Sequence, residues 1–266
     1  MKKALLLSRR NALEMLRDPV LYIFCLGFPV LMLGLFQIID RYTGGMTPVF
    51  LPRSLVPGVM VFSFSFLSLA LCLLVSRDKS TALLRRLYTA PLRSYQFVLG
   101  YAIPALAVGI AQAVLCVGAG LLLSALCGTD PFTLGEGCLL ILTQLLILCF
   151  CVFLGILLGT LFNDKSGPGV CSILISASGI LGGAWMPLDT MGAFEDFCRW
   201  LPFYPSVVFG RIVTGAQHSA LTPTAEATAY TLDRAALLGL IPLSVSLAAA
   251  VSLSFLVFHS RMSQDV

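Results

Sequence analysis

Residues 54–76 read SLVPGVMVFSFSFLSLALCLLVS, an uninterrupted run that contains no Asp, Glu, Lys, Arg or His. The hydrocarbon core of a membrane is about 30 Å thick, and about 20 apolar residues in an α-helix cross it. This run is therefore long enough to cross a membrane as one helix. Six runs of this kind occur, over 19–39, 54–76, 94–129, 137–163, 166–188 and 235–258. They predict spans over about 20–39, 55–76, 95–126, 137–163, 167–188 and 235–259. The predicted fold is an all-α, polytopic membrane protein with six transmembrane helices.

The composition of the whole chain agrees with this prediction. Hydrophobic residues make up 58% of the 266 residues and charged residues only 11%, and the mean hydropathy is +0.94. Soluble domains contain about 45–50% apolar and about 25% charged residues, so a soluble globular protein is excluded. One run, 94–129, is longer than a single crossing needs, yet it barely holds two crossings and a turn. Pro104 near its start favours a bend within one helix, and it is counted as one span.

Basic residues are unevenly divided between the two sides that six spans create. The side of the termini holds 12 of the 17 Lys and Arg residues, namely Lys2, Lys3, Arg9, Arg10, Arg17, Arg77, Lys79, Arg85, Arg86, Arg93, Lys165 and Arg261. The other side holds Arg41, Arg53, Arg199, Arg211 and Arg234. Because cytoplasmic loops carry the excess of Lys and Arg, both termini are predicted to be cytoplasmic. The net charge of +4 gives no reason to expect a nucleic-acid partner.

The segment 1–18 precedes the first span and is predicted to be an amphipathic helix. At 100° per residue its apolar side holds Ala4, Leu5, Ala12, Met15 and Leu16, and its basic side holds Lys2, Lys3, Arg9, Arg10 and Arg17. A helix of this kind lies in the headgroup plane with its basic side toward anionic lipid. The alternative is a positive flank that only fixes the topology.

The segment 77–93 is predicted to form a short cytoplasmic helix, capped by Ser80 or Thr81 and ended by Pro91. Two pairs of apolar side chains lie four residues apart, Leu83 with Leu87 and Leu84 with Tyr88. The basic residues Arg85 and Arg86 lie elsewhere on the helix. A helix that is both apolar and basic suits docking into the groove of a partner protein. The alternative is a turn lying on the membrane whose arginines only set the topology.

The segment 189–234, between the last two spans, is predicted to be extracellular. It is rich in aromatic residues, which suit the membrane interface, and Pro202 and Pro205 interrupt it. Each half is too short to cross the membrane, so a helical hairpin that dips from the outer surface is predicted, followed by a polar loop over 216–233. The alternative is an ordinary loop anchored by its aromatic residues.

Several chemistries are absent from the sequence. No phosphate-binding loop, dinucleotide fingerprint, zinc-protease motif or serine elbow occurs, so the chain is not predicted to hydrolyse nucleotides itself. His218 and His259 are the only histidines, and no cysteine has metal-ligand spacing near them. A bridge between Cys127 and Cys138 is geometrically possible. The expected spans contain no ionisable group of the kind that ion-driven carriers use.

The strongly polar side chains within the spans are three amides, Gln37, Gln112 and Gln144. Gln112 and Gln144 are candidates for contact with a transported substrate. They also suit hydrogen bonds to neighbouring helices, and this second interpretation is favoured.

Four segments together resemble the membrane subunit, or permease, of type-2 ATP-binding-cassette (ABC) exporters. They are Leu16-Arg17-Asp18-Pro19 with Phe28-Pro29-Val30, then Leu55-Val56-Pro57-Gly58, then 83–92 with Leu99-Gly100, and finally 178–215 with Met186-Pro187-Leu188 and Arg211-Ile212-Val213-Thr214-Gly215. Bacterial drug, antibiotic and polysaccharide exporters belong to this class. The chain departs from the family pattern at Ser76, where an acidic residue is usual, and at Ser80-Thr81 in place of Gly-Thr.

The resemblance implies an exporter in which two permeases, identical or related, bind two copies of a separate ABC ATPase. The ATPase would use ATP and Mg, and this chain itself would bind no cofactor. It assigns ATPase coupling to Arg77, Leu83, Leu84, Arg85, Arg86, Leu87 and Tyr88, and an exit hairpin to Pro187, Trp200, Pro202, Tyr204 and Pro205. The expected substrate is amphipathic or apolar, and membrane lipid surrounds the subunit in the inner (plasma) membrane. The alternatives are a passive channel, a membrane scaffold subunit or a membrane-embedded enzyme.

Overall fold

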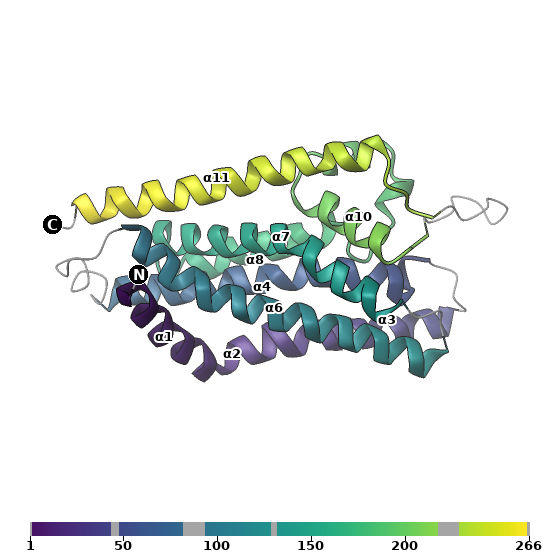
Figure 1. Ribbon diagram of the computed structural model, residues 1–266, viewed down its shortest axis with the longest axis horizontal. Coiled ribbons are helices and arrows are strands. Elements are labelled where there is room, and N and C mark those ends of the chain that lie inside the picture. The colour runs from purple at the N-terminus through teal and green to yellow at the C-terminus, as the bar shows by residue number, and fades with distance from the viewer. Residues whose placement is uncertain (1, 44–47, 82–93, 129–131, 218–228, 265–266) are drawn as a thin grey trace.

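The computed structural model describes residues 2–43, 48–81, 94–128, 132–217 and 229–264. Helices lie side by side in an elongated bundle, and the described residues hold no strand beyond an isolated bridge between Gln217 and Ala229 (Figure 1). The helices are α1 (Lys2–Arg17), α2 (Pro19–Leu21), α3 (Phe28–Thr43), α4 (Pro52–Ser80), α6 (Ser94–Cys127), α7 (Leu134–Leu161), α8 (Gly167–Leu181), α9 (Ala193–Cys198), α10 (Phe203–Val213) and α11 (Arg234–Gln264). The all-α prediction is confirmed for these residues.

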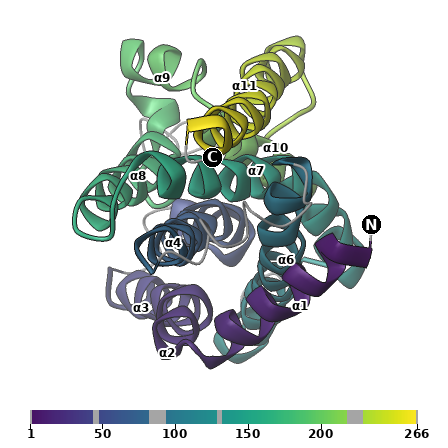
Figure 2. The ribbon, with the colours of Figure 1, turned by 90° about the vertical axis from the view of Figure 1, so that its left-hand side faces the viewer.

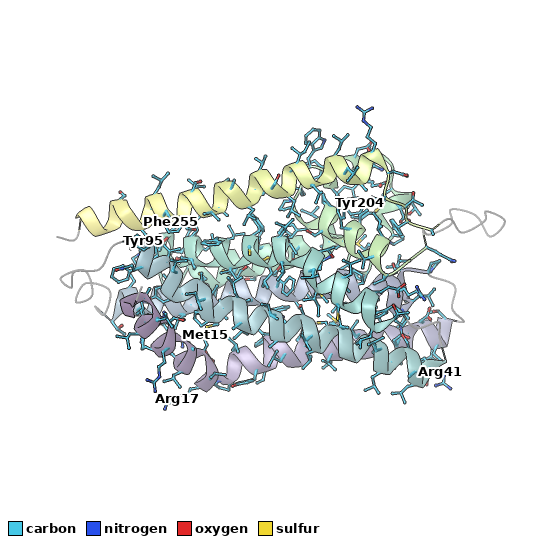
Figure 3. The ribbon with its side chains drawn as sticks, in the orientation of Figure 1. Met15, Arg17, Arg41, Tyr95, Tyr204 and Phe255 are labelled. Carbon is cyan, nitrogen blue, oxygen red and sulfur yellow. The ribbon has the colours of Figure 1, made fainter. Side chains whose placement is uncertain are left out.

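The two ends of the bundle differ. Helix α1 and the last turns of α11 lie at one end, called here the terminal end, and α9 and α10 lie toward the other, called the hairpin end (Figure 1). Figure 3 shows Arg17 at the terminal end, and Tyr204 and Arg41 toward the hairpin end. The chain therefore begins and ends on the same side of the bundle.

Helix α4 is the centre of the bundle and packs against α3, α6, α7, α8 and α10 (Figure 2). In its most apolar stretch 83% of the residues are buried, whereas the corresponding stretches of Tyr22–Thr43 and Ala236–Phe258 are only 22% and 17% buried. Two serines of α4 form hydrogen bonds to neighbouring helices. Ser65 donates to Ser178 Oγ at 2.6 Å, and Ser68 donates to the carbonyl of Cys151 at 2.7 Å. Burial on all sides explains why α4 carries no amphipathic pattern.

Helix α7 approaches α4 through two glycines one turn apart. A Cβ on Gly155 would lie 2.7 Å from the carbonyl oxygen of Ser68, and one on Gly159 would lie 2.9 Å from the carbonyl oxygen of Cys72. Small residues four apart allow helix backbones to meet closely inside a membrane. The pair therefore sets the distance between α4 and α7.

Among the described residues, five helical segments are long and apolar enough to cross a membrane: Tyr22–Thr43, Pro52–Ser80, Tyr95–Cys127, Leu134–Leu161 and Ala236–Phe258. The run 94–129 forms one helix with Pro104 inside it, as predicted. The predicted fifth span, 167–188, is not one continuous helix, because α8 ends at Leu181. Gly183 follows with a φ of +64°, a conformation that favours glycine and turns the chain.

Three predicted boundaries also need correction. The first membrane helix continues to Thr43 and begins with a π-helical turn over Tyr22–Gly27. The second continues to Ser80, and the N–H of Thr81 closes it by donating to the carbonyl of Arg77 at 2.9 Å. Residues 77–80 thus belong to α4 rather than to a separate helix, because no helix breaker separates them from the apolar run. The rest of the predicted coupling helix, 82–93, lies outside the described residues.

Candidate functional site

At the terminal end a buried carboxylate joins three helices. The side chain of Asp78 is 3% exposed, and Arg10 donates one hydrogen bond to each of its oxygens, at 2.5 and 2.8 Å. The hydroxyl of Tyr101 donates to Asp78 at 2.6 Å. The hydrogen bond to Asp78 raises the pKa of Arg10, so the guanidinium stays charged. This Asp78 cluster, defined as Arg10, Asp78 and Tyr101, ties α1 to α4 and α6.

The inward face of α1 differs from the predicted one. Its buried residues are Ala4, Leu7, Ser8, Asn11 and Met15, whereas Leu5 and Leu16 of the predicted apolar side are exposed together with Leu6 and Leu13. Asn11 donates to the carbonyl of Gly100 at 3.1 Å, and a Cβ on Gly100 would lie 2.7 Å from Leu7. The hydrogen bond from the Asn11 side chain and the contact between Leu7 and Gly100 therefore determine which face of α1 is buried. Hydrophobic periodicity detects neither of them. The exposed leucines lie on the opposite side of α1, which also carries the exposed Arg9.

Arg77 is the one residue of the predicted coupling set that the structure describes. Its side chain is 54% exposed, and its Nη1 lies 3.8 Å from a carboxylate oxygen of Asp18, where α1 passes into α2. Leu83, Leu84, Arg85, Arg86, Leu87 and Tyr88 lie outside the described residues. A cavity of about 270 Å³ lies beside Arg77, between α1 and α4, and Glu14 and Asp18 also line it.

At the hairpin end the chain forms the two short helices α9 and α10 after a 3₁₀ turn that follows Pro187. The predicted break at Pro205 is wrong, because α10 begins at Phe203 and Pro205 sits in its first turn, where a missing N–H costs nothing. Pro202 is the residue before α10. Tyr204 is buried and donates to Glu195 at 2.8 Å, and Trp200 is 78% exposed.

Arg211 on α10 is fully buried, which the sequence did not predict, since Arg211 was assigned to the outer loop charges. Its Nη2 donates to the carbonyl of Gly183 at 2.7 Å and its Nε to that of Ser54 at 3.3 Å. The guanidinium also lies 5.8 Å from the ring centre of Tyr230. Arg211 thereby joins α10 to the start of α4 and to the turn after α8. The sequence signal that could have predicted this burial is the presence of a single Arg within the apolar stretch 207–213.

Thr214 adds a second bond between these elements. Its hydroxyl donates to the carbonyl of Arg53, and its own carbonyl accepts from Arg53 Nη1 at 2.7 Å. The hairpin is thus fixed to the first turn of α4 by both Arg211 and Thr214.

The two candidate pathway amides lie inside the bundle. Gln112 and Gln144 are 0% and 1% exposed. Gln112 donates to the carbonyl of Ser63 on α4 at 2.9 Å, and Gln144 to that of Ser206 on α10 at 2.8 Å. Both bonds join helices of the same chain, as the interpretation of hydrogen bonds between helices requires. Among the described residues neither side-chain oxygen has a hydrogen-bond partner.

The remaining candidate groups add no chemistry to these sites. Within the described ranges no three His, Cys, Asp or Glu side chains gather in a way that suits a metal ion. Cys127 and Cys138 are exposed free thiols.

A family model described as ABC-2 family transporter protein matches residues 39–258. The match covers well over half of the chain and runs from the end of α3 to near the end of α11. It includes Arg211, both candidate pathway amides and the segment 82–93. Comparison with curated proteins finds no relative that matches.

Proposed function

We propose, from the membership of this chain in the ABC-2 transporter family, that it exports an amphipathic or apolar substrate. As a member of that family, the chain is a membrane subunit of an ABC transporter. Its substrate would be a drug, a peptide antibiotic or a lipid-linked molecule. The family match over residues 39–258 carries the proposal. The sequence lacks a phosphate-binding loop, so the energy comes from ATP and Mg used by a separate ATPase. Two copies of that ATPase bind a pair of identical or related permeases.

In this proposal the chain crosses the inner (plasma) membrane six times. Helix α8 has 15 residues, about 22 Å at 1.5 Å per residue, and residues 182–188 complete its crossing. The supporting observation is that α1 and the end of α11 lie at the same end of the bundle (Figure 1). The terminal end is cytoplasmic, since most Lys and Arg residues belong to it. The α9–α10 hairpin then lies at the outer surface, where Pro187, Trp200, Pro202, Tyr204 and Pro205 surround the exit.

Coupling to the ATPase occurs at the terminal end. Residues 83–88 follow α4 after a few residues, and the Asp78 cluster binds the last turns of α4 to α1 and α6. A displacement of residues 83–88 by the ATPase is therefore transmitted to three helices at once. Arg85 and Arg86 engage the ATPase surface, and Arg77 stays with α1 through Asp18. The exposed leucines of α1 face membrane lipid.

Charge reversal at Arg85 and Arg86 tests the coupling assignment. The variant R85E/R86E is expected to lower the amount of ATPase that co-purifies with the permease by about tenfold or more, because like charges placed across an interface repel. Quantitative co-purification of tagged permease measures the effect. The matched control is R41E/R234E, which reverses two exposed arginines at the hairpin end. Unchanged co-purification of R85E/R86E, or an equal loss in the control, contradicts the assignment.

Substitution of the two amides separates a substrate contact from a helix contact. The variant Q112L/Q144L is expected to lose about 0.6 kcal/mol of stability per amide, the usual strength of such bonds between membrane helices, and to keep its substrate range. Thermal unfolding and transport in vesicles that contain the ATPase measure the two effects. A changed substrate range would instead assign Gln112 and Gln144 to the pathway. Transport that proceeds without the ATPase would favour the passive channel.

A further inference from the structure

A cavity of about 490 Å³ lies between the α9–α10 hairpin and the first turns of α11. Three carboxylates and three aromatic side chains line it: Glu195, Asp196, Asp233, Trp200, Tyr204 and Tyr230. Pockets that bind small molecules have volumes of about 300–1,000 Å³ and combine apolar walls with a few fixed polar groups. The cavity has both properties, and Trp200, Tyr204 and Pro205 of the proposed exit hairpin form part of its wall, so a ligand bound here would extend the role proposed for the hairpin.

The charges around this cavity favour a cation. Of the described residues that line it, Arg199 alone is basic, and its guanidinium already contacts two of the carboxylates, Glu195 at 2.8 Å and Asp196 at 3.6 Å. Asp233 is exposed, and its carboxylate has no hydrogen-bond or ion-pair partner among the residues that the structure describes. Three acidic groups against one basic group leave an excess of negative charge, so an anion is disfavoured.

The walls of the cavity favour a ligand with an apolar, polarisable body. The ring of Tyr204 is held in place because its hydroxyl donates to Glu195 at 2.8 Å, and Trp200 stands 78% exposed at the margin. Aromatic faces attract organic cations. On one side of the cavity α11 and α10 are in close contact, since a Cβ on Gly239 would lie 3.0 Å from Pro205.

We propose that this hairpin pocket binds a hydrophobic organic cation, with the cationic centre near Asp233 and Asp196 and the apolar body against Trp200, Tyr204 and Tyr230. Binding needs only the folded chain in a bilayer and no ATPase. A failure of this proposal is therefore distinguishable from a failure of the export proposal.

The two tryptophans of the chain make a direct test possible. Trp185 packs between Phe36 and Phe62, away from the cavity, so W185F leaves Trp200 as the single fluorescent reporter. The probes are tetraphenylphosphonium and tetraphenylborate, which have nearly the same size and opposite charge. In phosphatidylcholine nanodiscs, tetraphenylphosphonium is expected to change the Trp200 emission in a saturable way, and tetraphenylborate is not. W200F, which keeps only Trp185, serves as the control for partition into the bilayer.

Charge removal locates the site. In the W185F background, D196N and D233N are each expected to weaken tetraphenylphosphonium binding about threefold, and the double variant about tenfold, as the loss of exposed charge contacts predicts. Both side chains are exposed, so the fold tolerates the changes. E14Q, which removes the same charge at the terminal end, is expected to leave the affinity unchanged. Equal responses to both probes, or unchanged affinity in the double variant, would overturn the proposal.

Discussion

The variant R211M is expected to lower the free energy of unfolding by about 3 kcal/mol. Arg211 makes charge-assisted hydrogen bonds to the carbonyls of Gly183 and Ser54 in a fully buried position, and bonds of this type contribute about 1.5–3 kcal/mol each. Methionine keeps most of the volume and removes every donor. Thermal or denaturant unfolding of the purified protein measures the change.

The control for R211M lies on the same hairpin. Arg199 is 49% exposed and pairs with Glu195 one turn away, and exposed pairs of this kind are worth about 1 kcal/mol or less. R199M is therefore expected to change stability much less than R211M. R211K should fall between the two, since it keeps the charge but lacks the fork of donors that reaches several carbonyls. If R199M were as damaging as R211M, the buried cation would not be what fixes the hairpin.

The variant R10Q is expected to lower the free energy of unfolding by about 2–3 kcal/mol, because it leaves the buried carboxylate of Asp78 without its cation. Asp78 has a 3% exposed side chain, and Tyr101 alone would remain as its donor. Arg10 is 38% exposed, so water compensates for part of the loss.

A double-mutant cycle isolates the pair. D78N removes the charge that Arg10 neutralises, so R10Q/D78N is expected to be more stable than the sum of the two single changes predicts, by about 1 kcal/mol or more. R9Q is the matched control, since Arg9 is exposed and neighbours Arg10 on α1. Additive effects of R10Q and D78N would show that the two side chains act independently and that α1 is held by Leu7 and Asn11 instead.

The long apolar runs were predictable because each is set by a local property, namely the absence of charge over the thickness of a membrane. The single helix through Pro104 and the break of the hairpin before α10 follow from similarly local signals. The end of α8 at Leu181 was missed because residues 182–188 carry no charge either, so the uncharged run continues past the end of the helix. A glycine in the left-handed region ends that helix, and composition does not reveal its φ.

The polar contacts of the site were harder to predict than the helices. Asp78 belongs to the segment 77–93, which is predicted as a short cytoplasmic helix with no special role for this residue, and its burial follows only from the packing of α1 across α6. Arg211 was interpreted as a surface charge. In both cases the partners lie far away in sequence, Arg10 for Asp78 and Ser54 for Arg211, so no local pattern could bring them together.

The position of α4 has a consequence for biosynthesis. Ribosomes release this helix before α6, α7 and α8, yet the partners of its buried polar groups are Gln112, Cys151 and Ser178 on those later helices. Until they emerge, hydroxyls of α4 such as those of Ser65 and Ser68 lack these acceptors, and hydrocarbon supplies none. The nascent segment is therefore expected to stay beside the insertion machinery until α8 has been translated. Chains truncated before that point would be substrates for membrane proteases.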